Sequence, residues 1–419
     1  MNLEEYRAAF DEVRADFEEG VARFGLPFES AEEQPRAARA LAPCEHCDNG
    51  AASLWSGWIS PACIACRTGE ETATFFISLK CTRQCYFCFN VNQEDYAYHR
   101  AHERDIASEL RAAHAAGARF RHLAVTGGEP CLHPDALLAF VRCAKELYPG
   151  VHVRVYTSGD LLSDELLDEL RDAGLDEIRF SVKQEEGAAS REETLGRIAA
   201  AVARIPDTMV EMPVIPGTLG EMKELLVSLD RIGVRGINLL EFCFPLANAE
   251  AFEERGFTLR RNPYVIPYNY WYAGGLPVSG SEASCLELLR FASDRSLTMG
   301  VHYCSLDNKL TGQIYQQNKL FLIDDEFSAS HAWLSFDGED YFLKCAKVFG
   351  DDVETVLDLL PAGRWLSDED ASSLAFPLAL AATVAKRAPA VEIGVSFNVL
   401  EPDENGLPRV REVALERLR

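Results

Sequence analysis

Long apolar runs are absent from this sequence. The longest apolar stretch extends from Leu374 to Ala385, contains Pro377, and falls short of the roughly 20 residues that a membrane-spanning helix needs. The chain opens with MNLEE rather than with a basic segment followed by an apolar one, which is the pattern of a secretory signal. These absences lead us to expect a cytoplasmic protein without a membrane partner.

Positive charge is also scarce. The 419 residues include 41 Lys and Arg against 66 Asp and Glu, which gives a formal net charge of -25. Such a surface repels a phosphate backbone, so we do not expect a nucleic acid partner. The hydrophobic content of 47% is typical of a globular protein, and the length predicts two or three domains.

Cysteine is abundant by contrast. Seven of the 13 cysteines lie between positions 44 and 88. The cytosol keeps thiols reduced, so in an unexported chain this clustering does not indicate a disulfide framework. Thiolates at short spacing are the ligands that soft and borderline metals prefer, and the cluster therefore predicts bound metal.

From residue 72 the pattern changes to short strands that alternate with longer helices. Strands are expected near 73–80, 121–126, 151–157, 177–183, 208–215 and 236–242, and helices near 100–117, 134–147, 163–173, 191–204 and 219–233. This alternation predicts parallel pairing. Arg179, Ser181 and Lys183 alternate with apolar residues along one strand, so one sheet face is polar. We therefore expect an α/β fold with an open, partial (β/α)6 barrel whose interior holds a charged ligand.

The strongest motif is the spacing Cys81-x3-Cys85-x2-Cys88 directly after the first expected strand. Three thiolates on a four-iron cluster leave one iron open, and an open iron can bind the amine and carboxylate of S-adenosylmethionine (SAM). With the aromatic Phe87 before the third cysteine, the motif closely resembles that of the radical SAM superfamily. The resemblance covers residues 72–245 and implies a 4Fe-4S cluster that cleaves SAM reductively to a 5′-deoxyadenosyl radical.

The resemblance also implies contacts with SAM from the ends of several strands. The expected binding residues are Gly127, Gly128 and Glu129 for the amine, Thr157 and Ser158 for the ribose, Ser181 and Lys183 for the carboxylate, and Glu211 for the ribose or the substrate. Enzymes of this kind need an electron donor, so a reductant such as flavodoxin or ferredoxin is an expected partner.

A second cysteine set has the spacing Cys44-x2-Cys47-x15-Cys63-x2-Cys66. Each Cys-x-x-Cys pair places two sulfurs on one side of a turn, and four thiolates suit structural zinc or a single rubredoxin-like iron. An auxiliary iron-sulfur cluster is the alternative. Elsewhere, Cys243 ends the sixth expected strand at the barrel mouth, where it is a candidate hydrogen donor or substrate contact; simple core packing is the alternative.

These patterns predict three domains. Residues 1–71 comprise an N-terminal helix over 2–25 and the four-cysteine metal module, residues 72–245 form the radical SAM core, and residues 246–419 form a C-terminal α+β domain for substrate or accessory contacts. The acidic charge and the added domain favour a peptide or protein as the substrate from which hydrogen is abstracted.

Two other functions are compatible with parts of the pattern. The length and the added C-terminal domain weakly resemble the cobalamin-dependent radical SAM arginine methyltransferases of methyl-coenzyme M reductase, although the sequence has no Asp-x-His-x-x-Gly cobalamin loop. A non-catalytic iron-sulfur electron-transfer protein is the alternative from another class. The Gly-Gly-Glu element and the polar barrel interior argue against it.

Overall fold

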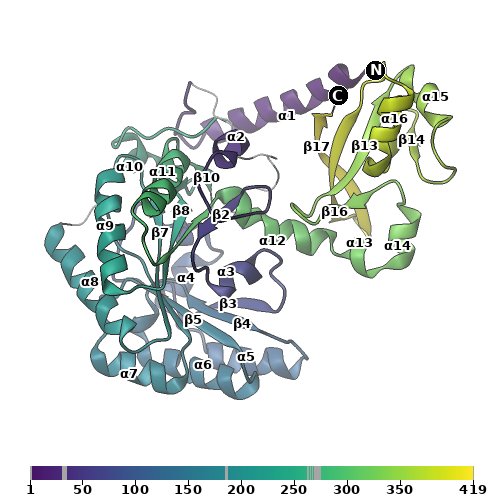
Figure 1. Cartoon of the computed structure of the whole chain (residues 1–419). Helices are drawn as coiled ribbons and strands as arrows, with labels where there is room; N and C mark the ends of the chain where they lie inside the picture. Colours follow the sequence, from purple (N-terminus) through teal and green to yellow (C-terminus); the bar gives the residue numbers. More distant parts are fainter. Residues whose placement is uncertain are drawn as a thin grey trace. The chain divides into compact units, whose positions relative to one another are not determined.

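Figure 1 shows the computed structural model of the chain, which describes residues 2–30, 35–184, 187–261, 264, 266, 268 and 275–418. The chain divides into two compact units. Residues 1–25, 264–269 and 310–419 make up one unit, and residues 26–263 and 270–309 make up the other. In the described part of the chain, no helix has the length and apolar character needed to cross a bilayer.

The larger unit is built on a nine-stranded sheet with the order β1-β2-β11-β8-β7-β6-β5-β4-β3. Seven neighbouring strands pair in parallel. They are β3 (Thr72–Phe76), β4 (His122–Thr126), β5 (His152–Thr157), β6 (Glu177–Phe180), β7 (Asp207–Val214), β8 (Gly236–Glu241) and β11 (Gly300–Cys304). The six predicted strands are thus confirmed, in sequence order and parallel, as expected for right-handed crossovers through helices.

Helices connect these strands and cover the outer face of the sheet (Figure 1). They are α5 (Ile106–Ala115), α6 (Pro134–Leu147), α7 (Asp164–Ala173), α8 (Ala188–Val202), α9 (Leu219–Ile232) and α11 (Ser281–Asp294). The short helix α4 (Tyr96–Ala101) instead contributes Tyr96 and Arg100 to the lining of the internal pocket. The apolar positions of the strands, such as Val153, Val155 and Val210, are fully buried in one core with these helices. The alternate positions face inward, so the predicted polar interior is confirmed by Arg179 and Glu211, which line the internal pocket.

The sheet extends beyond the segment 72–245 at both ends of the sequence. On the C-terminal side, α11 and β11 add one more helix–strand unit, and β11 pairs in parallel with β8. On the N-terminal side, β1 (His46–Asp48) and β2 (Ser53–Ser56) pair antiparallel, and β2 joins the free edge of β11. Further short elements of this unit are α2 (Pro35–Ala40), α3 (Pro61–Cys66), β9 (Cys243–Phe244), α10 (Ala249–Glu253), β10 (Leu276–Pro277) and the 3-10 helices Phe89–Asn92 and Pro130–Leu132.

The four-cysteine segment is therefore an edge of the barrel sheet, not a separate module. Local sequence patterns cannot show this, because the partner of β2 is more than 240 residues away along the chain.

The smaller unit is an antiparallel α+β structure with the strand order β14-β15-β13-β16-β17. Its strands are β12 (Ser335–Phe336), β13 (Leu343–Phe349), β14 (Leu366–Asp368), β15 (Ser373–Phe376), β16 (Gly394–Pro402) and β17 (Pro408–Arg417). Its helices are α1 (Leu3–Ala22), α13 (Leu320–Ile323), α14 (Asp325–Ser330), α15 (Asp352–Leu357), α16 (Ala381–Arg387) and the 3-10 helix Leu378–Leu380, while α12 (Leu306–Asn318) begins in the larger unit.

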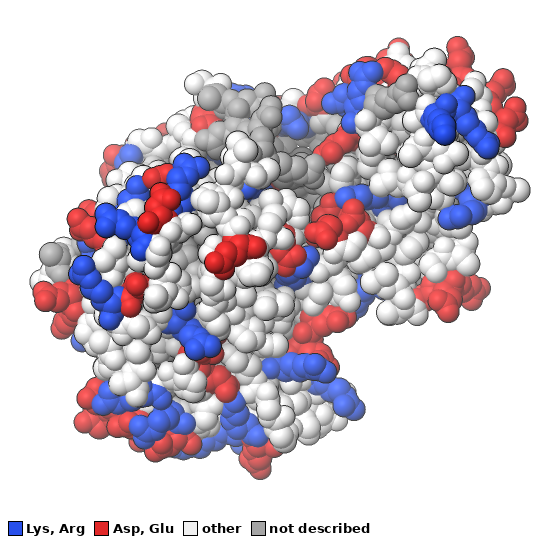
Figure 2. Space-filling model, viewed as in Figure 1, with Lys and Arg blue, Asp and Glu red and all other residues white. Residues whose placement is uncertain are grey.

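The N-terminal helix predicted over residues 2–25 is present as α1 and packs on this C-terminal sheet. The ring of Tyr6 lies 4.7 Å from that of Phe349, and its hydroxyl donates to Glu412 at 2.8 Å. On the face drawn in Figure 2, acidic and basic side chains lie interspersed.

Candidate active site

A pocket of about 1200 Å³ opens at the carboxyl ends of the parallel strands. This end of a β/α barrel is where catalytic groups collect. All of the cofactor-binding residues expected from the Cys81 motif and from the four strand ends line this one pocket, and so does Cys243. The tertiary structure thus brings together residues that are spread over more than 160 positions of the sequence.

The loop that carries Cys81, Cys85 and Cys88 is tied to the loop after β5. The guanidinium of Arg83 donates to Asp160 through Nε at 2.6 Å and through a second, shorter contact, and Thr82 donates to the same carboxylate at 2.9 Å. Within the loop, the backbone N–H of Cys88 donates to the carbonyl of Cys85. The three thiols are therefore presented on a constrained turn and not on a free strand connection.

The two glycines before Glu129 hold the start of this same loop. A Cβ on Gly128 would lie 1.8 Å from the carbonyl oxygen of Lys80, and one on Gly127 would lie 2.7 Å from that of Ser78. The close approach allows the N–H of Gly128 to donate to the carbonyl of Ser78 at 3.1 Å and the N–H of Glu129 to donate to the carbonyl of Lys80 at 2.8 Å. Because glycine has no side chain, the backbone of residues 78–80, just before Cys81, can pack directly against Gly127 and Gly128.

The carboxylate of Glu129 joins this segment to the end of β5. It is 2% exposed and accepts four hydrogen bonds, two at each oxygen. The donors are the N–H of Cys131 at 3.1 Å, the hydroxyl of Thr157 at 2.8 Å, and the N–H and hydroxyl of Ser158 at 2.8 and 2.7 Å. The residues expected to bind the amine and the ribose thus form one buried network.

Lys183 brings a positive charge to the cysteine loop. Its ammonium donates to Ser181 at 3.0 Å and lies 5.9 Å from the centre of the Phe87 ring. Burial raises the pKa of both Cys81 and Cys88, and the nearby ammonium opposes that rise. Thiolates must form when metal binds, so a cation at this position favours the bound state.

These features fit a four-iron cluster with one open iron and a SAM molecule beside it. Three thiols on one loop supply three ligands, and the pocket has room for an organic ligand next to them. When bound, this pair of cofactors supplies electron transfer into SAM and a carbon radical.

The four sulfurs of the second cysteine set do not converge on one position. In the register of β1 and β2, Cys47 lies opposite Leu54, whose side chain belongs to the outer core with the helices. The inner face carries Ser53, which contacts His302 at 2.9 Å. No three of the four sulfurs, all within described residues, lie within 4.8 Å of one another, whereas a tetrahedral single-metal site with bonds of about 2.3 Å needs separations of about 3.8 Å.

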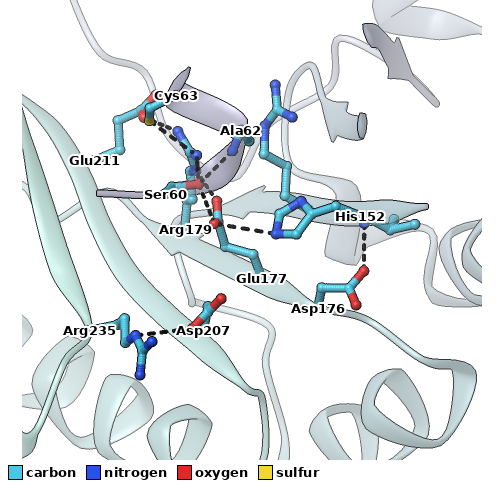
Figure 3. A network of polar contacts seen from close by, with 12 residues as sticks. Ser60, Ala62, Cys63, His152, Asp176, Glu177, Arg179, Asp207, Glu211 and Arg235 are labelled. Carbon is cyan, nitrogen blue, oxygen red and sulfur yellow. Dashed lines mark hydrogen bonds and ion pairs between the residues drawn. The ribbon is translucent and has the colours of Figure 1, made fainter. Parts of the chain in front are cut away.

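Cys63 instead faces the barrel interior, where it meets Arg179. The guanidinium donates to Glu177 and Glu211 at 2.5 Å each, to Ser60 at 3.0 Å and to the sulfur of Cys63 at 3.5 Å (Figure 3). Burial would raise the pKa of Glu211, but Arg179 and the amide of Asn238 outweigh it and hold that pKa below its ordinary value.

Sequence reasoning missed this network. The inward position of Glu177, two residues before Arg179 on the same strand, was the signal that could have revealed it.

Cys243 lies at the pocket wall, but on the separate short strand β9 and not at the end of the sixth predicted strand, since β8 ends at Glu241. It is 9% exposed, and burial raises the pKa of its thiol although the ammonium of Lys309 opposes the rise. The group is therefore a neutral thiol at the edge of the pocket.

Comparison with known proteins agrees with this geometry. Residues 75–229 match the family model of the radical SAM superfamily. The chain is 24% identical over 306 residues to the "Putative glycyl-radical enzyme activating enzyme" of Methanocaldococcus jannaschii, which covers 68% of this chain and 76% of that protein. It is 36% identical over 105 residues to the PqqA peptide cyclase of Methylorubrum populi, which covers 25% of this chain and 26% of the cyclase.

Among solved structures, coproporphyrinogen III oxidase of Escherichia coli aligns over 57% of this chain and 56% of its own, with a TM-score of 0.36 and 14% identity. The family match spans the three-cysteine loop, the Gly-Gly-Glu segment and strands β4 to β7. Residues 75–229 thus form a radical SAM domain, and the members of that superfamily are enzymes.

Proposed function

We propose that this enzyme cleaves SAM reductively at a 4Fe-4S cluster held by Cys81, Cys85 and Cys88 and abstracts hydrogen from a peptide or protein. The observation that carries the proposal is the single pocket that collects the three cysteines with the Gly-Gly-Glu segment and the strand-end residues. An electron donor such as flavodoxin or ferredoxin supplies the reducing electron.

The charges of the pocket wall match the two ends of the methionine part of SAM. Lys183, beside the cysteine loop, offers an ammonium to the carboxylate, and Glu129 offers a negative charge to the amine. The hydroxyls of Thr157 and Ser158 donate to Glu129 and orient its carboxylate, and since both residues line the pocket we assign them to the ribose. Glu211, anchored by Arg179, lines the same pocket, and we assign it to the ribose or the substrate.

The peptide or protein substrate is supported by the relatives and by the chain's own charge. One relative is named as a peptide cyclase and another as an activating enzyme of a glycyl-radical enzyme, so both names refer to peptide or protein substrates. A surface with a formal charge of -25 does not attract nucleic acid.

Cys243 is the candidate catalytic thiol. A substrate radical can take a hydrogen atom from a neutral S–H group, and burial keeps this thiol protonated at the pocket edge. The remaining sulfur radical then needs one electron and one proton, which the same reductant and solvent supply. A Cys243→Ser variant should still form 5′-deoxyadenosine from SAM but should lose the substrate product.

The experiment that tests the main proposal replaces Cys81, Cys85 and Cys88 together with Ala. Under anaerobic, reducing conditions the wild type should form 5′-deoxyadenosine without S-adenosylhomocysteine, and the triple variant should form neither. Cys143→Ala, at a buried cysteine outside the pocket, is the matched control and should keep full activity. Cleavage retained in the triple variant contradicts the proposal, and S-adenosylhomocysteine released with bound cobalamin would show a methyltransferase instead.

We also propose that the segment with Cys44, Cys47, Cys63 and Cys66 binds a second metal. The paired Cys-x-x-Cys spacing supports it, and the inward position of Cys63 supports a centre close to the barrel. Replacement of Cys63 and Cys66 by Ala should remove this metal and leave the iron of the Cys81 loop in place. Unchanged total metal in that variant would show that the segment is not a metal site.

A further inference from the structure

Cys304 lies on the same inner face of the barrel as Cys63. In the register of β2 and β11, Cys304 is opposite Ser53, and directly opposed residues of an antiparallel pair point to the same side. Ser53 contacts His302, and His302 contacts Asn238 at 2.9 Å within the barrel. The side chain of Asn238 also donates to the sulfur of Cys63 at 3.1 Å. A chain of buried polar contacts thus joins the β2–β11 edge to Cys63.

Both sulfurs already accept N–H groups of the kind that surround metal-bound thiolates. Cys63 accepts from Asn238 and from Arg179, the latter contact being drawn in Figure 3. Cys304 accepts from the amide of Asn308 at 3.2 Å. Hydrogen bonds to cysteine sulfur stabilise the anionic form and tune the potential of iron-sulfur sites.

Cys66 lies on the same face of one short helix as Cys63. Both belong to α3 (Pro61–Cys66), where residues three positions apart lie on the same side of the helix. Cys47, by contrast, points to the helix side of the same sheet edge with Leu54. The inner face therefore gathers three cysteines, of which one was not expected from spacing.

We propose that Cys63, Cys66 and Cys304 are ligands of the second metal centre, and that Cys304 takes the place that spacing assigns to Cys47. The centre is an iron-sulfur cluster, because thiolate ligands select soft metals and because the sulfurs are spaced too widely for one ion.

Such a centre borders the radical pocket. Arg179 contacts Cys63 on one side and Glu211 on the other, and both Arg179 and Glu211 line the pocket. The inference deepens the proposed second metal site and does not depend on SAM cleavage.

The test uses the full chain with Cys81, Cys85 and Cys88 replaced by Ala, so that only the second centre can hold iron. This background is expected to have no SAM cleavage. Iron binding at the second centre can therefore be measured whether or not the proposed radical reaction is correct. After anaerobic reconstitution with iron and sulfide, iron and sulfide per chain and the electron paramagnetic resonance spectrum of the reduced protein are measured.

In this background, the added change Cys304→Ala should reduce iron and sulfide to the level of a Cys63→Ala variant. Cys47→Ala and the buried control Cys143→Ala should keep both. Cys304→Ser keeps nearly the same side-chain shape, so it separates loss of a ligand from a folding defect. The melting temperatures of all variants are compared for the same reason. Full iron in both Cys304 variants, loss of iron in Cys47→Ala, or zinc bound in place of iron and sulfide would each overturn the assignment.

Discussion

The sharpest consequence of the pocket geometry concerns Glu129. If this residue served only to bind the amine of SAM, its removal would weaken SAM binding and leave the ligand-free protein as stable as before. The structure instead assigns its carboxylate four hydrogen bonds from the protein. We therefore predict that Glu129→Ala destabilises the protein even without cluster or SAM.

The magnitude follows from the donors that lose their partner. The backbone N–H groups of Cys131 and Ser158 cannot rotate towards water, and a buried donor without a partner costs about 1–3 kcal/mol. The two hydroxyls can turn to other acceptors and add less. Glu129→Ala should therefore lower the free energy of unfolding by about 2–6 kcal/mol. Each 1 kcal/mol shifts Tm by about 2–4 °C in a large domain, so Tm should fall by at least about 4 °C.

The assay compares the melting of cluster-free protein for the wild type, Glu129→Ala and Glu129→Gln. Gln keeps one acceptor oxygen and places a donor at the other position, so its loss should be intermediate. Glu254→Ala is the matched control, because Glu254 lines the same pocket with an exposed side chain. An unchanged Tm in Glu129→Ala, together with weaker SAM binding, would refute the structural role argued here.

Three further predictions follow from single contacts. Gly128→Ala should prevent stable iron binding at the Cys81 loop, because its Cβ would meet the carbonyl of Lys80 at 1.8 Å; Gly196→Ala, with open space around it, should keep wild-type iron content and Tm. Arg39→Met should cost up to about 3–5 kcal/mol in denaturant unfolding, because Arg39 is 1% exposed and both Glu282 and Asp307 would lose this buried cation, although Arg260 still lies 3.4 Å from Glu282; a loss below about 1 kcal/mol would contradict this. Burial would raise the pKa of Asp160, but Arg83 and Thr82 outweigh it and hold that pKa below its ordinary value of 3.8. Because the folded pKa is lowered, the contact stabilises the protein above about pH 4 and is lost as pH falls through the lowered value, so the stability difference between wild type and Asp160→Asn should be constant from pH 7 to about pH 5 and shrink below about pH 4.

The sequence alone was sufficient for the core of the barrel and for the primary site. Strict alternation along β5, β6 and β7 fixes which side chains face inward, because successive residues of a strand point to opposite faces. Parallel strands in sequence order then place all of their carboxyl ends at one edge, so Cys81, Glu129 and Lys183 had to share a pocket once the strands were identified.

The role of each residue within that pocket required the tertiary structure. The resemblance implied that Gly128 and Glu129 lie near SAM, but it did not show that Gly128 packs on Lys80 or that Glu129 holds the end of β5. Such contacts join loops that follow different strands, and the strand register over many residues determines which loop residues meet.

The edges of the barrel were decided by tertiary structure alone. The pairing of β2 with β11 joins residues near 55 to residues near 302, and no local pattern reports a contact over that separation. The same pairing separates Cys47 from Cys63 and brings Cys304 to the inner face, because a strand residue can point to only one side of its sheet. Cysteine spacing along the sequence therefore predicted a metal-binding segment, while the sheet face on which each strand cysteine lies was determined by long-range strand pairing.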